Sequence, residues 1–272
     1  MAHKIVFSDI DGTLLNSKRS LSNHTIKIVK HISEKLPFIL ISARMPSAMR
    51  HLQDDLGIKH YPIIAYNGGL VLVDDKPISS TTIPLNIVED LHHFNSEMDC
   101  HLSLYHNDEW YVPREDKWSA REETNTKVSP EIKSNAEVIA KWKKEEKGAH
   151  KIMAMGAEEN IDKIRDFLAE NYGDKLHLYR SKSTYLEIAN KEISKFSAIK
   201  YLLKAHYECD AQDCIAFGDN YNDVEMVKGV GTGVAVANAR EEVLEVAKVV
   251  THAGTEDGVA KSLIELFELK DF

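Results

Sequence analysis

Two aspartates separated by a single isoleucine follow an apolar run near the start of the chain, in the segment KIVFSDIDGTLL at residues 4–15. Side chains two positions apart in an extended chain point the same way, so the carboxylates of Asp9 and Asp11 can face one site. Gly12 comes next and permits a tight turn with exposed backbone N–H groups that could cradle an anion. The segment therefore predicts two carboxylates beside an anion-binding turn.

Three further segments place polar side chains where strands are expected to end, which is where open α/β sheets bind their ligands. Ser42 and Arg44 follow the run FILI and offer a hydroxyl and a guanidinium that could hold an oxyanion. Lys195 follows the run TYLEIA at the start of a helical pattern. The segment GDNYND at 218–223 follows the run DCIAF and supplies two more carboxylates and an amide.

Together the four segments supply an acidic cluster, one lysine, a serine and backbone amides. Carboxylates that converge on one point repel each other unless a cation lies among them, and hard oxygen ligands suit Mg²⁺. Mg²⁺ and a lysine beside backbone N–H groups form a phosphate site, where a remaining carboxylate can attack phosphorus. Each segment also has a plain structural explanation, such as a helix cap at Asp219 and Asn220. Their coincidence at four expected strand ends favours the phosphate site.

The elements that must position these residues alternate between strands and helices in both halves of the chain. Uniformly apolar runs predict strands at 4–8, 38–42, 62–66, 213–217 and 232–237. Helical spacing of apolar residues predicts helices at 22–36, 194–206, 222–229, 240–247 and 256–267, with Ser22 as an N-cap, and another helix between Pro46 and Gly57. Apolar strands that alternate with helices argue for a parallel sheet covered on both faces, as in a Rossmann-like α/β domain.

The middle of the chain is richer in strands. HLSLYH and EWYV flank the dipeptide ND like the arms of a hairpin, and 149–155 predicts a strand before an amphipathic helix at 158–171. The lysine-glutamate run KWKKEEK is most simply a solvated helix face. We therefore expect an α/β core formed by 1–84 and 187–272, with an α+β domain inserted at 85–186.

Composition narrows the classes of function. The chain has 272 residues and a formal net charge of −9, so a nucleic-acid-binding surface is not expected. The longest apolar runs are too short to span a membrane, and no signal peptide is recognisable. The three cysteines have no paired spacing, which favours free thiols in a reducing cytoplasm.

The four segments resemble the four motifs of the haloacid dehalogenase-like (HAD) superfamily: DIDGT at 9–13, Ser42, Lys195 and GDNYND at 218–223. The length of the chain and the position and α+β character of its insert are similar to the Cof-type branch with a type IIB cap. YNGG at 66–69 and EDGVAKSL at 256–263 add to the resemblance. It implies a Mg²⁺-dependent phosphatase of small phosphorylated metabolites that works through an aspartyl-phosphate intermediate. Sugar phosphates are the expected class of substrate, and nucleotides, phytate-like compounds and pyridoxal phosphate are the alternatives.

The resemblance also implies a role for each matching residue. Asp9 would be the nucleophile, and Asp11 the general acid that protonates the leaving alkoxide and then the base that activates water. Mg²⁺ would be held by the Asp9 carboxylate, the Asp11 backbone carbonyl and Asp219, with Asp223 as a further ligand, direct or through water. The phosphoryl oxygens would be bound by Ser42, Lys195, Asn222 and the backbone N–H groups of Gly12 and Thr13. Ala43 departs from the family pattern, in which the second motif often reads Thr-Gly-Arg, and so does Ser8, where an aromatic residue is frequent.

The aspartate at position 11 favours a phosphatase or a phosphomutase, because ATPases of the superfamily carry threonine there and dehalogenases lack this acid. A hexose phosphomutase would isomerise a sugar phosphate instead of releasing phosphate. A non-catalytic sensor of sugar phosphates would bind without turnover, but it would need neither a nucleophile nor an acid. Substrate contacts could come from the insert, whose candidates are His106, Asn107, Trp110, Arg114, Trp118, Arg121, Arg180 and Tyr185, although Trp110 and Tyr111 are best explained as hairpin packing.

Overall fold

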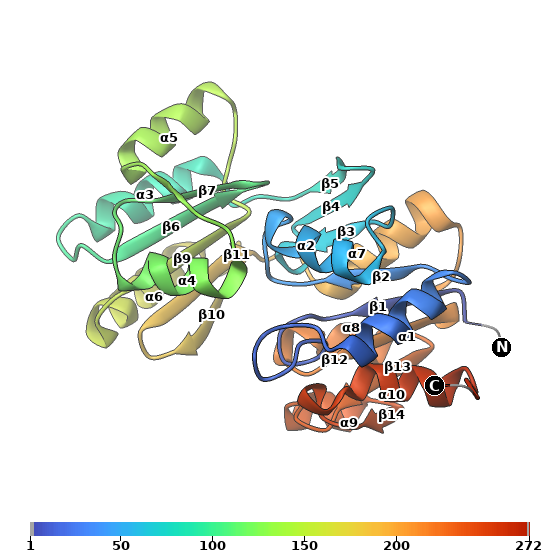
Figure 1. The fold of residues 1–272 in the computed structure, drawn as a ribbon. Helices are drawn as coiled ribbons and strands as arrows, with labels where there is room; N and C mark the ends of the chain where they lie inside the picture. The colour runs from blue at the N-terminus through green and yellow to red at the C-terminus, as the bar shows by residue number, and fades with distance from the viewer. Residues whose placement is uncertain (1–2, 271) are drawn as a thin grey trace. The chain divides into compact units, whose positions relative to one another are not determined.

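The computed structural model describes residues 3–270 and 272 and separates into two compact units. The core unit is formed by the chain before Ser80 together with the chain from Ser194 onward, and the insert unit is Ser80–Ile193 (Figure 1). The sequence places these boundaries at 84/85 and 186/187. In the structure the two units divide at 79/80 and 193/194. The strand Tyr185–Asn190 lies in the insert unit because it pairs with other strands of that unit.

The core unit is built on an eight-stranded sheet in the order β14-β13-β12-β1-β2-β3-β4-β5. The strands from β14 to β3 pair in parallel, and β4 pairs antiparallel with β3. Every residue of β1, β2, β3 and β12 is buried, as expected for strands covered on both faces. The strands are β1 Ile5–Ser8, β2 Phe38–Ile41, β3 Ile63–Ala65, β4 Leu70–Val73, β5 Lys76–Ser80, β12 Cys214–Gly218, β13 Thr232–Val236 and β14 Val249–Thr251.

Helices of the core unit begin and end at residues with clear local causes. Ser22 caps the first helix by accepting a hydrogen bond from the Thr25 N–H, and Gly57 ends the second in a left-handed conformation. The helices are α1 Asn23–Ser33, α2 Ser47–Leu56, α7 Lys195–Leu202, α8 Val224–Gly229, α9 Glu241–Val246 and α10 Gly258–Leu266. Short helical turns lie at η1 Tyr66–Gly68, η2 Leu203–Tyr207, η3 Ala211–Asp213, η4 Tyr221–Asp223 and η5 Gly254–Glu256.

The insert unit has a six-stranded sheet in the order β10-β11-β9-β6-β7-β8. Its strands are β6 His101–His106, β7 Glu109–Val112, β8 Glu131–Ile132, β9 Lys151–Met155, β10 Leu176–Lys182 and β11 Tyr185–Asn190. The predicted hairpin is confirmed, since β6 and β7 pair antiparallel and Asn107 in the turn has a φ of +53°. Side chains from α3 Leu85–Asn95, α5 Asn135–Lys144 and α6 Glu158–Tyr172 join those of the strands in one apolar core.

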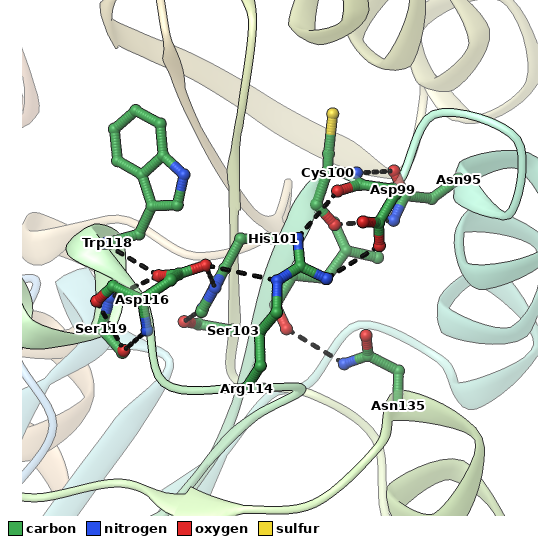
Figure 2. Close-up of polar contacts among 11 residues, drawn as sticks. Asn95, Asp99, Cys100, His101, Ser103, Arg114, Asp116, Trp118, Ser119 and Asn135 are labelled. Atoms are coloured by element: carbon green, nitrogen blue, oxygen red, sulfur yellow. Dashed lines mark hydrogen bonds and ion pairs between the residues drawn. The ribbon is translucent and has the colours of Figure 1, made fainter.

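The helix α4 (Lys117–Thr126) is held differently, because its only buried residues are Ser119 and Thr126. Asp116 caps it and also accepts a hydrogen bond of 2.8 Å from His101 Nδ1, while His101 Nε2 lies 3.0 Å from Ser103 Oγ (Figure 2). Burial lowers the pKa of His101 against the opposing effect of Asp116, which favours the neutral ring. The order Ser-His-Asp imitates a nucleophilic triad, but Ser103 is completely buried, so the network anchors α4 instead.

No helix in the described part of the chain combines the length and the apolar character that crossing a bilayer requires.

Candidate active site

Asp9 and Asp11 lie just beyond the carboxyl end of β1. The Asp9 N–H donates to the Phe217 carbonyl at 3.0 Å and so continues the pairing of β1 with β12. Ile10 between them is fully buried, whereas the Asp9 side chain is 7% exposed and that of Asp11 is 38% exposed. The two carboxylates therefore start from one strand end but differ in their access to solvent.

Lys195 is the buried cation of the site. Its Nζ donates to Asp9 Oδ1 at 2.5 Å and to Asp223 Oδ1 at 2.6 Å, and the side chain has no exposed surface. Ser194 caps α7 through the Ser197 N–H, so the helix begins with the lysine itself. Burial alone would lower the pKa of Lys195, but the charges and hydrogen bonds of Asp223 and Asp9 outweigh it and raise this pKa, which keeps the ammonium charged.

A cluster of three carboxylates could hold a metal ion. One oxygen each from Asp9, Asp219 and Asp223 lies within 4.8 Å of the others. Burial, with added repulsion from Asp223, raises the pKa of Asp219 to about 6, and burial together with both neighbouring acids raises that of Asp9 well above its usual range. A divalent cation would offset this repulsion, and an all-oxygen donor set suits Mg²⁺.

Asp223 uses both oxygens of its carboxylate within the protein. Oδ1 accepts from Lys195, and Oδ2 accepts from the N–H groups of Asp219 at 2.9 Å and Asn220 at 3.0 Å. Gly218 leaves room for this arrangement, because a Cβ there would lie 2.5 Å from the Cβ of Asp223. The carboxylate thus shapes the loop that carries Asp219, a role that the sequence did not suggest.

Gly12 and Thr13 form the turn that brings the first motif against Asp219. Gly12 has a φ of +92°, and a Cβ there would lie 2.3 Å from Asp219 Oδ2, so only glycine fits. The Thr13 hydroxyl donates to Asp219 Oδ1 at 2.7 Å, which leaves the backbone N–H as the group that could meet a phosphate. Asn238, just after β13, supports the turn by donating to the Gly12 carbonyl at 2.9 Å. Its position after a strand was the available sequence signal, and it was missed.

Ser42 and Asn222 are brought together by Asn67. The Asn67 N–H donates to the Ser42 carbonyl at 2.8 Å, and Asn222 Nδ2 donates to Asn67 Oδ1 at 2.9 Å. Asn67 adopts a φ of +56°, which asparagine tolerates better than most residues. It belongs to the YNGG segment, whose sequence hinted at a role without indicating what it does.

Arg44 holds a carboxylate of the protein itself. Its Nε and Nη2 donate to Asp11 Oδ2 and Oδ1 at 2.7 and 2.8 Å, and Arg19 Nη2 adds a third contact at 2.7 Å. Burial would raise the pKa of Asp11, but the hydrogen bonds and charge of Arg44 and the charge of Arg19 outweigh it and lower this pKa. Nothing in the sequence pointed to Arg19, which lies in a polar loop eight residues after Asp11.

Most candidate contacts in the insert unit have structural partners. Arg114 pairs with Asp99 at 2.8 Å, as Figure 2 shows, and the ring of Trp110 stacks on that of Tyr105 at 5.6 Å. Burial of Trp110 and Tyr111 agrees with their interpretation as hairpin packing. The other members engaged within the insert are His106 with the Gly148 carbonyl, Asn107 with His150, and Arg180 with Asp162.

Three of the candidates instead form an accessible aromatic-basic cluster. The rings of Trp118 and Tyr185 meet edge to face at 5.1 Å, and Arg121 Nη1 lies 3.4 Å from the Tyr185 hydroxyl. Arg121 is exposed, and both rings are partly exposed. This cluster retains groups that could contact a ligand.

Comparison with known proteins agrees with this geometry. A model of the haloacid dehalogenase-like hydrolase family matches residues 6–263. A candidate phosphatase of Haemophilus influenzae is 34% identical over 275 residues, which cover 98% of this chain and 99% of the relative. A haloacid dehalogenase-like hydrolase structure from Bacteroides thetaiotaomicron superposes with a TM-score of 0.89 at 24% identity, covering 97% of this chain and 100% of its own.

The fold, including its insert, is also similar to that of a HAD phosphatase of subclass IIB. The HAD subclass IIB sugar phosphatase BT4131 has the same fold, with a TM-score of 0.79 at 22% identity over 97% of this chain and 99% of its own. The family match and the relative from Haemophilus influenzae extend over nearly the whole chain, including both halves of the core unit and the insert between them. The chain therefore belongs to the haloacid dehalogenase-like hydrolase family, and within that family it is a phosphatase.

Proposed function

We propose that this phosphatase hydrolyses small phosphorylated metabolites, with sugar phosphates as the substrate class, and that it does so with Mg²⁺ through an aspartyl-phosphate. One observation carries the mechanism: Lys195 holds the buried Asp9 carboxylate within a cluster of oxygen ligands, two residues from a second carboxylate. The substrate class rests on the family resemblance, with which the named activity of BT4131 agrees. We expect the protein in the cytoplasm, where its three thiols, none of them in a disulfide, would stay reduced.

Asp9 acts as the nucleophile. An oxygen of its carboxylate attacks phosphorus, the bond from phosphorus to the ester oxygen breaks, and the phosphoryl group is transferred to Asp9. Lys195 fixes the orientation of this carboxylate and contributes positive charge where the phosphate arrives. Ser42, Asn222 and the N–H groups of the turn would bind the phosphoryl oxygens.

Asp11 acts first as the general acid and then as the general base. It donates a proton to the ester oxygen as the alcohol leaves, then accepts one from the water that attacks the aspartyl-phosphate and releases phosphate. Its Oδ1 accepts hydrogen bonds from Arg44 and Arg19, and its Oδ2 accepts one from Arg44, so Oδ2 keeps a lone pair that could take up the proton.

The oxygen donors fit Mg²⁺, as their mutual repulsion indicates. Asp9, Asp219 and the Asp11 backbone carbonyl would hold the ion, and Asp223 would contribute through water, because both its oxygens already serve Lys195 and the loop. When bound there, Mg²⁺ would neutralise charge so that a carboxylate and a phosphate can approach each other.

Release of inorganic phosphate from a panel of phosphorylated metabolites, with Mg²⁺ and with a chelator, tests this proposal. We expect turnover that requires Mg²⁺ and that Asp9→Asn abolishes while the protein stays folded. Asp54→Asn, which removes an exposed carboxylate paired with Lys59 in the same unit, is the matched control and should retain full activity. Near-normal activity of Asp9→Asn, or equal activity with and without Mg²⁺, would overturn the mechanism.

A further inference from the structure

The loop that follows the first motif is closed around Asn16 and presents an arginine to Asp11. Asn16 Oδ1 accepts from the N–H groups of Lys18 at 2.9 Å and Ser20 at 3.2 Å. The Asn16 N–H donates to the Ser20 carbonyl at 3.0 Å, and the Arg19 N–H donates to the Asn16 carbonyl at 2.9 Å. Arg19 has a φ of +56°, a left-handed conformation that is costly for most residues other than glycine and is common at functional sites.

Arg19 is the second guanidinium on Asp11 and the more exposed of the two. Its side chain is 50% exposed and reaches Asp11 Oδ1 through one nitrogen. Arg44 binds both oxygens of Asp11, donates to the Ala48 carbonyl at 3.2 Å and is only 6% exposed. Arg44 alone can therefore neutralise and orient the Asp11 carboxylate, and Arg19 adds a positive charge beyond that need.

Two guanidinium groups meet the single carboxylate of Asp11. In the part of the chain that the structure describes, Asp11 is the only carboxylate that pairs with Arg19, and the exposed Lys18 precedes it. A guanidinium binds the oxygens of a carboxylate or phosphate through paired N–H groups and keeps its charge at any working pH. An anionic group on a ligand would therefore be stabilised next to Arg19.

The contacts of the two arginines indicate which of them can leave Asp11. Arg44 makes two of the three contacts, one to each oxygen of Asp11, and Arg19 makes the third. Arg44 is buried and tied to the backbone at Ala48, whereas Arg19 is half exposed and makes a single contact. Arg19 is accordingly the partner that can leave.

We propose that Arg19 is a specificity-determining residue that leaves Asp11 to bind a second anionic group of the substrate, close to the phosphate ester. The inference rests on the proposed phosphatase function and narrows the proposed class of sugar phosphates to members that carry a carboxylate or a second phosphate a few bonds from the ester oxygen. Such a group takes the place of the Asp11 carboxylate on Arg19, while Arg44 keeps its contacts to both oxygens of Asp11. A neutral hydroxyl in the same place leaves Arg19 on Asp11.

Competition against p-nitrophenyl phosphate hydrolysis tests the role of Arg19. The competitors are 3-phosphoglycerate and glycerol 3-phosphate, which share a three-carbon skeleton and differ in a carboxylate against a hydroxymethyl group. We expect the wild-type enzyme to bind 3-phosphoglycerate about tenfold more tightly than glycerol 3-phosphate. Arg19→Gln should remove most of that preference, and Arg19→Lys should keep part of it. Arg50→Gln, which breaks a pair with Asp75 in the same unit, should leave it unchanged.

The outcomes separate this inference from the phosphatase function. Equal inhibition by the two compounds in the wild type, or a preference that survives Arg19→Gln, overturns the role of Arg19. Continued hydrolysis of p-nitrophenyl phosphate in that case shows that the phosphatase function itself stands. Calorimetric titration of both compounds into Asp9→Asn, with and without Arg19→Gln, measures the same preference without turnover, so a failure of hydrolysis does not hide the result.

Discussion

Removing the ammonium of Lys195 should destabilise the core unit more than any substitution on its surface. Lys195→Met keeps most of the aliphatic volume but leaves Asp9 and Asp223, which the lysine contacts at 2.5 and 2.6 Å, without their buried counter-ion. Breaking a buried ion pair by removing one partner costs roughly 3–5 kcal/mol of unfolding free energy. For a domain of this size, that corresponds to a fall in melting temperature of about 6–20 °C.

The cost of Lys195→Met should depend on pH in a predictable direction. Burial already raises the pKa of Asp9, and Lys195 is the main influence that opposes it. Without the lysine, this pKa rises further. A carboxyl group whose pKa is higher in the folded than in the unfolded state favours folding at low pH, and its contribution is lost as pH rises through the folded pKa. The variant should therefore differ less from wild type near pH 4 than near pH 7.

Urea unfolding with a chelator present, at both pH values, measures the effect. Lys200→Met is the matched control, because Lys200 is exposed on the same helix, and it should change the unfolding free energy by less than about 0.5 kcal/mol. Adding Asp9→Asn to Lys195→Met removes one uncompensated charge and should restore part of the loss near pH 7. A loss below about 1 kcal/mol near pH 7, or one independent of pH, would refute the buried ion pair as the cause.

Three further outcomes follow from the geometry. Asp11→Asn should lose most activity toward alkyl phosphates but less toward p-nitrophenyl phosphate, whose leaving group needs little protonation; equal losses would contradict the acid role. With a chelator present, the contribution of Asp219 to stability should fall as pH rises from about 4 through 6, because burial raises the pKa of Asp219 in the folded protein to about 6. Asp219→Asn cannot ionise and should therefore gain melting temperature relative to wild type over this range, and a difference that does not change with pH would count against the assignment. His101→Leu removes the ring that holds Asp116 and should lower the unfolding free energy of the insert unit by roughly 1–3 kcal/mol, measured by denaturation, whereas the exposed His177→Leu should not.

The parallel strands could be predicted because a strand that is buried on both faces consists almost entirely of apolar residues. Runs such as FILI and DCIAF are apolar throughout and are bounded by polar segments. The hairpin of β4 and β5 was missed, because β5 reads KPISS, lies at the edge of the sheet and has no buried residue. The helix α4 was missed for a related reason: it has no apolar stripe, and polar contacts at Asp116 hold it.

Residues of the candidate site could be predicted where they directly follow an apolar strand, as Asp9 and Asp219 do. The sequence predicts Lys195 at the end of a core strand, but the strand before it belongs to the insert. The lysine is positioned instead by the start of α7. The pairing of Arg44 with Asp11 joins residues 33 apart, and that of Lys195 with Asp9 joins residues 186 apart. Such pairings depend on how loops fold back in space, and no local spacing encodes them.

The electrostatics of Asp9 and Asp11 are opposite to what phosphoryl transfer needs of them. Burial and two neighbouring acids raise the pKa of Asp9, although a nucleophile must be ionised, and two arginines lower the pKa of Asp11, although an acid must carry a proton. Positive charge among Asp9 and its acidic neighbours would favour the ionised nucleophile. The negative charge of a bound phosphate, together with the departure of Arg19, would favour a protonated Asp11. Both changes in pKa require a bound ligand. The site should therefore become catalytically competent only when the cation and the substrate are bound together.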